Sequence, residues 1–279
     1  MKKQIVTTFS PPQDMLDVGL FLFLQHKKSG KTTLADLVCS ILAHYGYELA
    51  AVRNDVHDRL DRYVQSERIE LATTFDMLEG HISLDLDRHE VLVSLIEEMM
   101  SRQRTAIIYD SSAAAGEHLP TVLLRDLYVQ QLAEHGRSAM CFVPLRPTDD
   151  IAAGALGAMK AAEIALEGQL IVPVIIGLDV DIAQLPPEHD FFKCIARAQH
   201  GVIRLPYVQP AIAMSIDRLT LPLHALSNPE SLPTRRQVRS DIGCTTGQAG
   251  LVVAAIAEMV SVLRTQLAKV GIGPLDSKD

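Results

Sequence analysis

Apolar, strand-like runs and amphipathic, helix-like stretches alternate along most of this chain, and this alternation constrains its fold more than any other feature. Six runs have the length and apolar content of buried strands, at residues 18–24, 47–52, 105–109, 138–143, 168–178 and 201–205. Stretches with helical spacing separate or follow them, at residues 33–45, 90–100, 120–134, 151–166 and 250–270. The alternation predicts an α/β fold with a mostly parallel sheet and helices on both faces.

Polar segments follow several of the expected strands. Right-handed crossovers bring the carboxyl ends of parallel strands to one edge of the sheet, where ligands of such folds bind. The segments that reach this edge are residues 25–33, 54–58, 110–116 and 206–217. We therefore expect the functional site to be built from them.

The most informative of these segments contains Ser29-Gly30-Lys31-Thr32-Thr33, between an apolar strand and an amphipathic helix. This is the setting of a phosphate-binding P-loop, in which backbone N–H groups and the helix N-terminus hold phosphate. In such a loop the lysine reaches the outer phosphates and the next hydroxyl binds Mg²⁺. Lys31 and Thr32 fill these two positions, so the sequence predicts a P-loop NTPase fold.

The first half of the loop departs from the P-loop pattern. The pattern has a glycine five residues before Gly30, where this chain has Gln25, and Lys27 and Lys28 stand in the middle of the loop. Glycine is used where the backbone takes a positive φ or approaches a ligand closely, so the loop is degenerate. An ordinary strand-to-helix turn with a chance Gly-Lys-Thr is the alternative interpretation.

Two acidic residues follow expected strands where a P-loop enzyme needs carboxylates. Asp110 ends the third strand, which is the Walker B arrangement for holding the Mg²⁺ shell. Asp55 lies just beyond the second strand and is suited to orient an attacking water, a role for which Asp58 competes. A helix cap or turn at Asp110 and a solvated loop acid at Asp55 remain as alternatives.

Over roughly residues 20–225, the order of these motifs resembles the ParA/MinD family of deviant Walker A ATPases. The stretch LQHKKSGKTT aligns with the family loop GKGGVGKTT when Gln25 is set against the first glycine. Further matches to the family's acidic pair, Walker B strand, next strand and late turn fall at residues 53–55, 107–111, 141–144 and 204–206. Within the family, residues 110–114 and 192–206 are most similar to TraL-type proteins of conjugative plasmids.

The resemblance implies ATP and Mg²⁺ as cofactors and gives roles to individual residues. It assigns catalysis to Lys31 and Asp55 and the metal to Thr32 and Asp110. It assigns nucleotide contacts to Gln25, His26, Lys27, Lys28, Ser29, Gly30, Lys31, Thr32, Thr33 and Pro206.

Three positions depart from the family pattern. Arg53 replaces the first acid, His26 replaces the lysine that crosses the family dimer (Lys27 is one residue away), and Gly177 replaces an adenine-reading asparagine. These departures leave open ATP against GTP, nucleotide-dependent dimerisation and whether hydrolysis is retained.

The function implied by the resemblance is an ATP-dependent molecular switch, in plasmid or DNA partition or in conjugative transfer. It would work as a slow ATPase and a homodimer with a protein partner. The first alternative is a catalytically inactive P-loop adaptor that binds a protein partner. The second is a small-molecule kinase with Arg53, Arg59 and Arg62 as lid arginines.

The 279 residues contain no Gly/Ser-rich linker, so we expect one domain over residues 16–271, with a loose arm at 1–15 and a tail at 272–279. A net charge of −8 excludes a nucleic-acid binder that uses its whole surface. Residues 227–239 are expected to be a surface excursion. Its Arg235, Arg236 and Arg239 leave non-specific DNA contact open.

Several features predict a protein of the cytoplasm. The four cysteines lie far apart with no CxxC pair, which suits a reducing compartment. No apolar run approaches the roughly 20 residues of a membrane span, and the start carries no signal peptide. The amphipathic stretch 250–267 is expected to pack against the sheet rather than a membrane.

Overall fold

The computed structural model describes residues 8–12, 17–25, 29–53, 59–64, 66–68, 90–111, 128–177, 182–227 and 232–274. Within them, seven strands form one parallel sheet in the order β3-β2-β4-β1-β5-β6-β7. The strands are β1 Val18–Phe23, β2 Glu48–Arg53, β3 Ser66–Arg68, β4 Thr105–Asp110, β5 Ser138–Leu145, β6 Leu170–Ile175 and β7 Ile203–Arg204. The predicted parallel α/β fold is confirmed.

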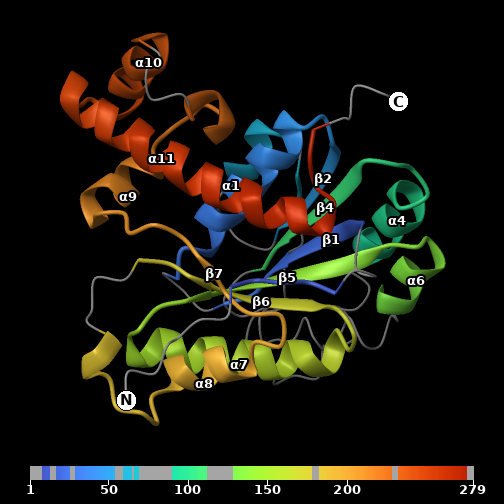
Figure 1. Ribbon diagram of the computed structural model, residues 1–279. Coiled ribbons are helices and arrows are strands. Elements are labelled where there is room, and N and C mark those ends of the chain that lie inside the picture. The colour runs from blue at the N-terminus through green and yellow to red at the C-terminus, as the bar shows by residue number, and fades with distance from the viewer. Residues whose placement is uncertain are drawn as a thin grey trace, which may run out of the picture.

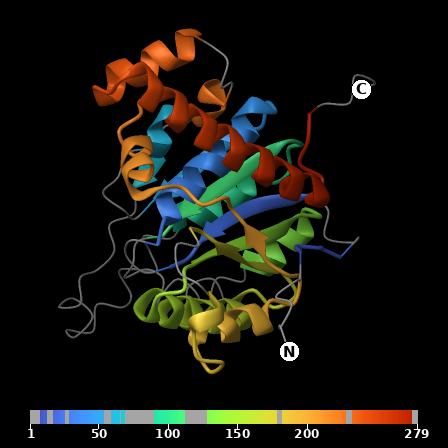
Figure 2. The ribbon, with the colours of Figure 1, turned by 60° about the vertical axis from the view of Figure 1, so that its left-hand side comes forward.

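Helices cover both faces of this sheet (Figure 1). On one face lie α1 Lys31–His44 and α11 Thr246–Leu267, with α9 Pro210–Ile216, α10 Leu232–Ile242 and the short 3₁₀ helices η1 Arg59–Arg62 and η3 Leu223–Leu226. The other face is covered by α4 Glu90–Met99, α6 Tyr128–Glu134, α7 Asp149–Ala165 and α8 Asp190–Arg197. Figure 2 shows the twisted sheet between the two helical layers.

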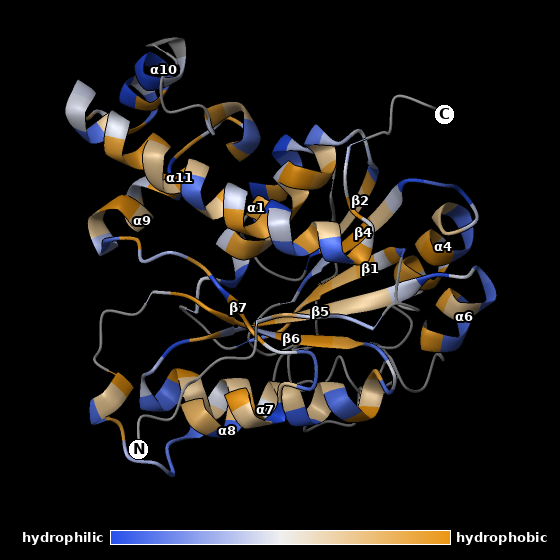
Figure 3. Ribbon diagram, viewed as in Figure 1, coloured by the Kyte–Doolittle hydropathy of each residue, from blue (hydrophilic) through white to orange (hydrophobic). Residues whose placement is uncertain are grey.

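The strand side chains divide between two apolar cores. In β1, Val18, Phe21 and Phe23 belong to the core beneath α1 and α11, whereas Leu20 and Leu22 belong to the core above α7. Because both faces of a parallel sheet are covered, such strands are apolar at nearly every position. Figure 3 shows this as mostly hydrophobic strands between helices of mixed hydropathy.

The residue 8–10 part of the expected loose arm is docked on the edge of the sheet. Thr8 forms a parallel bridge to Val202, and the Phe9 N–H donates to the Val202 carbonyl at 3.2 Å. The Phe9 side chain is fully buried, and Lys269 Nζ donates to its carbonyl at 2.6 Å. Since burying a phenylalanine stabilises by about 1.5–3 kcal/mol, this part of the arm is anchored, contrary to expectation.

The arginine-rich segment, predicted as a surface excursion, contains a helix. Residues 232–242 form α10, which packs on α11 through the buried Val238 and leaves Arg236 and Arg239 exposed. Pro233 is compatible with this helix because it stands in the first turn, where its missing N–H would have no partner. The strand β3 was not anticipated from the sequence either.

The last long helix carries an apolar stripe. Among the described residues, the segment Thr246–Val270 is long and apolar enough to cross a membrane by length and composition, and 39% of its window is buried here. Its buried side chains, which include Val252, Ile256, Val260 and Leu263, belong to the core beneath α1. The helix packs on α1, α9, α10 and η3 and meets the sheet at β7, so the predicted packing against the sheet is found at its β7 edge.

Candidate phosphate-binding site

The site lies where the order of the strands reverses. β1 is paired with β4 on one side and β5 on the other, so the chain builds the sheet outward from β1 in both directions. The edge formed by the carboxyl ends of the strands at such a switch point is where open α/β sheets bind ligands. Asp110 at the end of β4, Gln25 after β1 and Arg146 after β5 all stand at this edge.

Gly30 lies in the turn from β1 into α1, where the backbone conformation and the space available both require glycine. Its φ is +89°, which side chains disfavour, and a Cβ would lie 3.2 Å from Ile176 Cδ1. Its carbonyl accepts the Leu34 N–H at 3.0 Å, so α1 begins directly after it. The first N–H groups of a helix have no intrahelical partners, and this end of α1 therefore favours an anion.

Lys31 and Asp110 form a buried ion pair at this end of α1. Their side chains are 7% and 3% exposed, and Lys31 Nζ donates to Asp110 Oδ1. The sequence placed both residues in the site, and the structure brings them together from elements separated by 79 positions. Two buried charges are tolerated because each neutralises the other, and removing one would leave an uncompensated charge.

Ser29 carries a buried hydroxyl in the same turn. Its Oγ has no hydrogen-bond partner among the residues that the structure describes. A buried donor left unpaired costs about 1–3 kcal/mol, which an oxygen of a bound phosphate would recover. The orphaned hydroxyl thus fits a phosphate group at the start of α1.

Gln25, which stands where the P-loop pattern has a glycine, has a structural role. Its side-chain Nε2 donates to the carbonyls of Pro144 and Ile151 at 2.9 and 3.1 Å. It therefore ties the end of β1 to the end of β5 and the first turn of α7. This amide serves the fold, and a nucleotide contact of Gln25 stays a prediction.

The two threonines of the motif have different surroundings. Thr33 Oγ1 accepts a hydrogen bond from Arg59 Nη1 at 3.2 Å, and Arg59 also pairs with Asp217. The Thr33 hydroxyl is thus engaged with η1, whereas Thr32 stands in the first turn beside Lys31. Thr32 and Asp110 supply a hydroxyl and a carboxylate, oxygen donors of the kind that Mg²⁺ prefers.

A narrow cavity of about 60 Å³ adjoins the phosphate turn. It is bounded by Gly30 and Thr33 on one side and by the ends of β6 and β7 on the other, where Gly177 and Pro206 line it. Pro206 therefore lies beside the phosphate turn, and its contact with a nucleotide stays a prediction. Arg146 also lines the cavity, and sequence analysis did not identify it.

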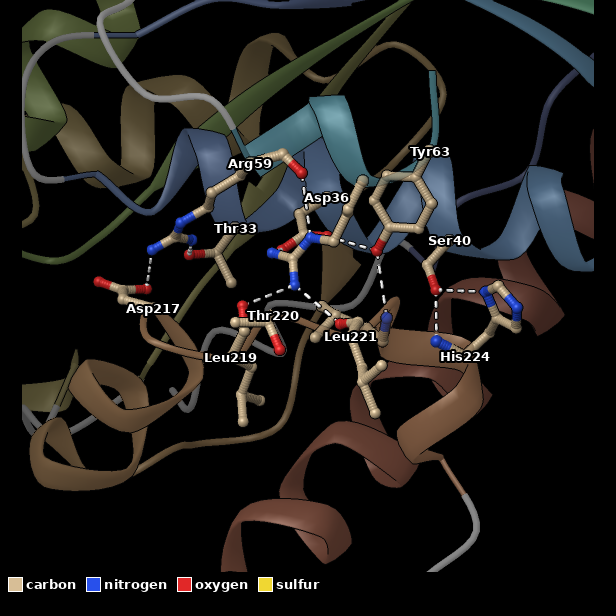
Figure 4. A network of polar contacts seen from close by, with 12 residues as sticks. Thr33, Asp36, Ser40, Arg59, Tyr63, Asp217, Leu219, Thr220, Leu221 and His224 are labelled. Carbon is tan, nitrogen blue, oxygen red and sulfur yellow. Dashed lines mark hydrogen bonds and ion pairs between the residues drawn. The ribbon is translucent and has the colours of Figure 1, made fainter. Parts of the chain in front are cut away.

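A second charged cluster lies deeper along α1 (Figure 4). The fully buried Asp36 accepts from Arg62 Nη2 and from the Tyr63 hydroxyl, both at 2.5 Å. Arg62 Nη1 also donates to the carbonyls of Leu219 and Leu221, at 3.0 and 2.8 Å. Burial raises the pKa of Asp36 to about 6, although Arg62 and Tyr63 oppose this rise.

The same cluster continues toward η3. The Tyr63 hydroxyl accepts the Leu223 N–H at 3.1 Å, and Ser40 Oγ bonds His224 Nδ1 at 3.0 Å. The cluster therefore fastens α1 and η1 to residues 219–224. Sequence analysis missed it, although one acid between the apolar Leu34 and Leu37 was a usable signal.

Several predicted site residues lie outside the described part of the chain. These are His26, Lys27 and Lys28 of the loop and the acids Asp55 and Asp58. Among the residues that the structure does describe, no three His, Cys, Asp or Glu side chains gather into a metal-binding group.

The strand order, with a Gly-Lys-Thr turn after β1 and an aspartate ending β4, defines an α/β P-loop NTPase fold. No protein-family model and no curated protein matches the chain.

Solved structures do match it. The MinC:MinD cell division protein complex of Aquifex aeolicus is 15% identical, with a TM-score of 0.46 over 82% of this chain and 97% of that chain. A ParA family ATPase from Chlorobium tepidum TLS is 16% identical, with a TM-score of 0.45 over 84% and 98%. The MinD cell division protein of Aquifex aeolicus is 15% identical, with a TM-score of 0.46 over 82% and 98%. These neighbours are named for the family that the motifs resemble, whereas the narrower TraL resemblance stays a prediction.

Proposed function

We propose that this protein binds a nucleoside triphosphate with Mg²⁺ and works as a ParA/MinD-like ATP-dependent switch. The observation that carries the proposal is the buried Lys31–Asp110 pair at the switch point of the sheet. The left-handed Gly30 and the unpaired Ser29 hydroxyl stand beside it. Together they provide a cation, a carboxylate and donors at a helix N-terminus, which is the equipment for holding phosphate and its metal.

Each residue has a distinct role in this proposal. Lys31 neutralises phosphate charge, while Thr32 and Asp110 hold the metal. Mg²⁺, when bound, offsets the negative charge that builds up on the phosphates during transfer. Asp55 positions water for hydrolysis, a role that stays a prediction from sequence. Lys31 and Asp110 contact one another here, so the remaining donors of Lys31 would bind phosphate, while the Asp110 carboxylate would turn toward the metal.

The decisive experiment is calorimetric titration with ATP and Mg²⁺, comparing the wild type with Lys31→Ala. Loss of a charged hydrogen bond is expected to weaken binding by about tenfold to hundredfold. Lys160→Ala, on the exposed face of α7, is the matched control and should bind as the wild type does. Since Lys31→Ala removes the cation beside the buried Asp110 carboxylate, the double variant Lys31→Met/Asp110→Asn provides a second test in which that charge is also removed. Equal affinities in all proteins would overturn the proposal.

A nucleotide switch needs a partner whose affinity depends on the bound nucleotide. We place the process in plasmid or DNA partition or in conjugative transfer, with a cytoplasmic homodimer built from one domain over residues 16–271. The family resemblance supports this setting. Sedimentation with and without ATP and Mg²⁺ tests the dimer, and an unchanged mass would contradict nucleotide-dependent dimerisation.

The partner interaction proposed for α10 is non-specific contact with DNA. Arg236 and Arg239 are exposed and three residues apart, so they share a face, with the half-buried Arg235 alongside. Phosphate contacts of this kind weaken steeply with salt. Replacing both exposed arginines by glutamine should lower DNA affinity and the salt slope, and an unchanged slope would exclude this surface.

The alternatives make different predictions. An inactive adaptor should show no ATP turnover, so turnover that disappears in Asp55→Ala would exclude it. A small-molecule kinase needs free arginines to cover its phosphates. Arg59 and Arg62 are instead engaged with Thr33, Asp217 and Asp36, which disfavours the kinase.

A further inference from the structure

Arg146 is a half-buried arginine at the edge formed by the carboxyl ends of the strands. It directly follows β5 and lines the cavity beside Gly30. Its Nε is buried, with no hydrogen-bond partner among the residues that the structure describes. A guanidinium N–H removed from water without an acceptor is costly, so a ligand that supplies an acceptor there gains that free energy.

The other walls of the cavity have little polar chemistry to offer. Most are apolar, with Ile176, Pro206 and Val208 among them. Thr33 is the only other polar side chain in the described lining, and its hydroxyl is engaged with Arg59. Neither Lys31 nor Asp110 belongs to the described lining, so the cavity stands apart from the phosphate-binding charges.

An apolar slot with a single polar anchor suits the edge of a planar heterocycle, the part of a nucleotide remote from its phosphates. At about 60 Å³ the cavity admits such an edge while the rest of the ring lies outside. At the end of β6, Gly177 has no side chain with which to contact a base.

We propose that Arg146 is the residue that selects the base, and that it makes the site prefer guanine to adenine nucleotides. This inference rests on the proposed binding of a nucleoside triphosphate with Mg²⁺, and it changes the preferred base of that nucleotide from adenine to guanine. A guanidinium carries five donors and no acceptor. Guanine presents two adjacent acceptors, O6 and N7, which an arginine binds in a bidentate manner, whereas adenine places an amino donor beside N7. Arg146 therefore matches one edge of guanine and meets a donor on adenine.

The test is calorimetric titration with GDP, IDP and ADP, each with Mg²⁺, so that hydrolysis plays no part. Hypoxanthine keeps O6 and N7 but lacks the 2-amino group, so IDP isolates the edge that Arg146 would read. For the wild type we expect GDP and IDP to bind alike and about tenfold or more tighter than ADP.

Three variants complete the design. Arg146→Met keeps the length of the side chain without donors and should remove the preference. Arg146→Gln offers one donor and one acceptor, which suits adenine N6 and N7, and should shift the preference toward ADP. Arg218→Gln changes an exposed arginine near the end of α9 that does not line the cavity, and should leave the preference unchanged.

The outcomes separate this inference from the function on which it rests. If the wild type binds none of the three nucleotides, the proposed function fails and the inference fails with it. If nucleotides bind and Lys31→Ala weakens them, yet the wild type prefers ADP or Arg146→Met keeps the wild-type ratio, only the role of Arg146 is overturned.

Discussion

Two charged clusters on the same helix, five residues apart, show how differently a fold can hold buried charge. At the start of α1, and among the residues that the structure describes, Lys31 uses one of its three N–H donors, on Asp110. Further along, Asp36 accepts from two side chains, and its partner Arg62 also holds two backbone carbonyls. The first cluster keeps donors available for a ligand, whereas the second is saturated by the fold. The comparison teaches that burial by itself does not mark a functional charge, and that the number of partners does.

The saturated cluster should produce the largest loss of stability. Arg62→Met leaves Asp36 and two carbonyls without their donor, so we expect the free energy of unfolding to fall by about 3–5 kcal/mol. Urea denaturation measures this change. Arg102→Met, which removes an exposed arginine paired with Glu48, is the control and should cost about 1 kcal/mol or less. A loss for Arg62→Met as small as the control's would contradict saturation.

The pH dependence of stability tests the same cluster. The pKa of Asp36 is about 6 in the folded protein, against 3.8 ordinarily, so its stabilising contribution is complete below about pH 4. That contribution falls as pH rises to about 6, by about 3 kcal/mol in total. The unfolding free energy of wild type minus Asp36→Asn should therefore decrease from pH 4 to 6 and level off above. A difference that stays constant over this range would show that Asp36 titrates normally.

Removing both partners of each pair compares the clusters directly. Lys31→Met/Asp110→Asn should change the free energy of unfolding by less than about 1 kcal/mol, because apolar or neutral replacements of a buried pair are often tolerated. Asp36→Asn/Arg62→Met should still lose about 2 kcal/mol or more, since the Leu219 and Leu221 carbonyls lose their donors. Equal losses in the two double variants would remove the distinction drawn between the clusters.

The smallest effects are expected on α10, where charge is exposed. Arg236→Gln and Arg239→Gln should each change stability by less than about 0.5 kcal/mol. On the buried face of the same helix, Val238→Ala should cost about 1–3 kcal/mol. Thermal unfolding of the three variants provides the comparison. A large loss from either arginine would show that these side chains hold the fold rather than serve a partner.

Much of the fold could be predicted because its strands carry strong local signals. The run at residues 18–24 is apolar throughout, as a strand covered on both faces must be. The bounds of β1 agree with this run to within one residue. β3 is three residues long and carries Ser66, Glu67 and Arg68, so no apolar period marks it. The docking of Phe9 was missed for a related reason, since it is fixed by packing against residues far away in the sequence.

The sequence by itself determined where the strands and the phosphate turn lie along the chain. The spacing of apolar and polar residues places Gly30, Lys31 and Thr32 between a strand and a helix. It also places Asp110 at the end of a later strand. These are local facts, because each depends on residues within a few positions of one another.

Only the tertiary structure decided what those residues and their neighbours contact. It pairs Lys31 with Asp110, turns the amide of Gln25 toward β5 and α7, and encloses Asp36 with Arg62 and Tyr63. It also leaves the Nε of Arg146 unpaired among the described residues, beside a cavity. The physical reason is that partners 26 to 126 positions apart meet only after the helices and strands that carry them have packed together.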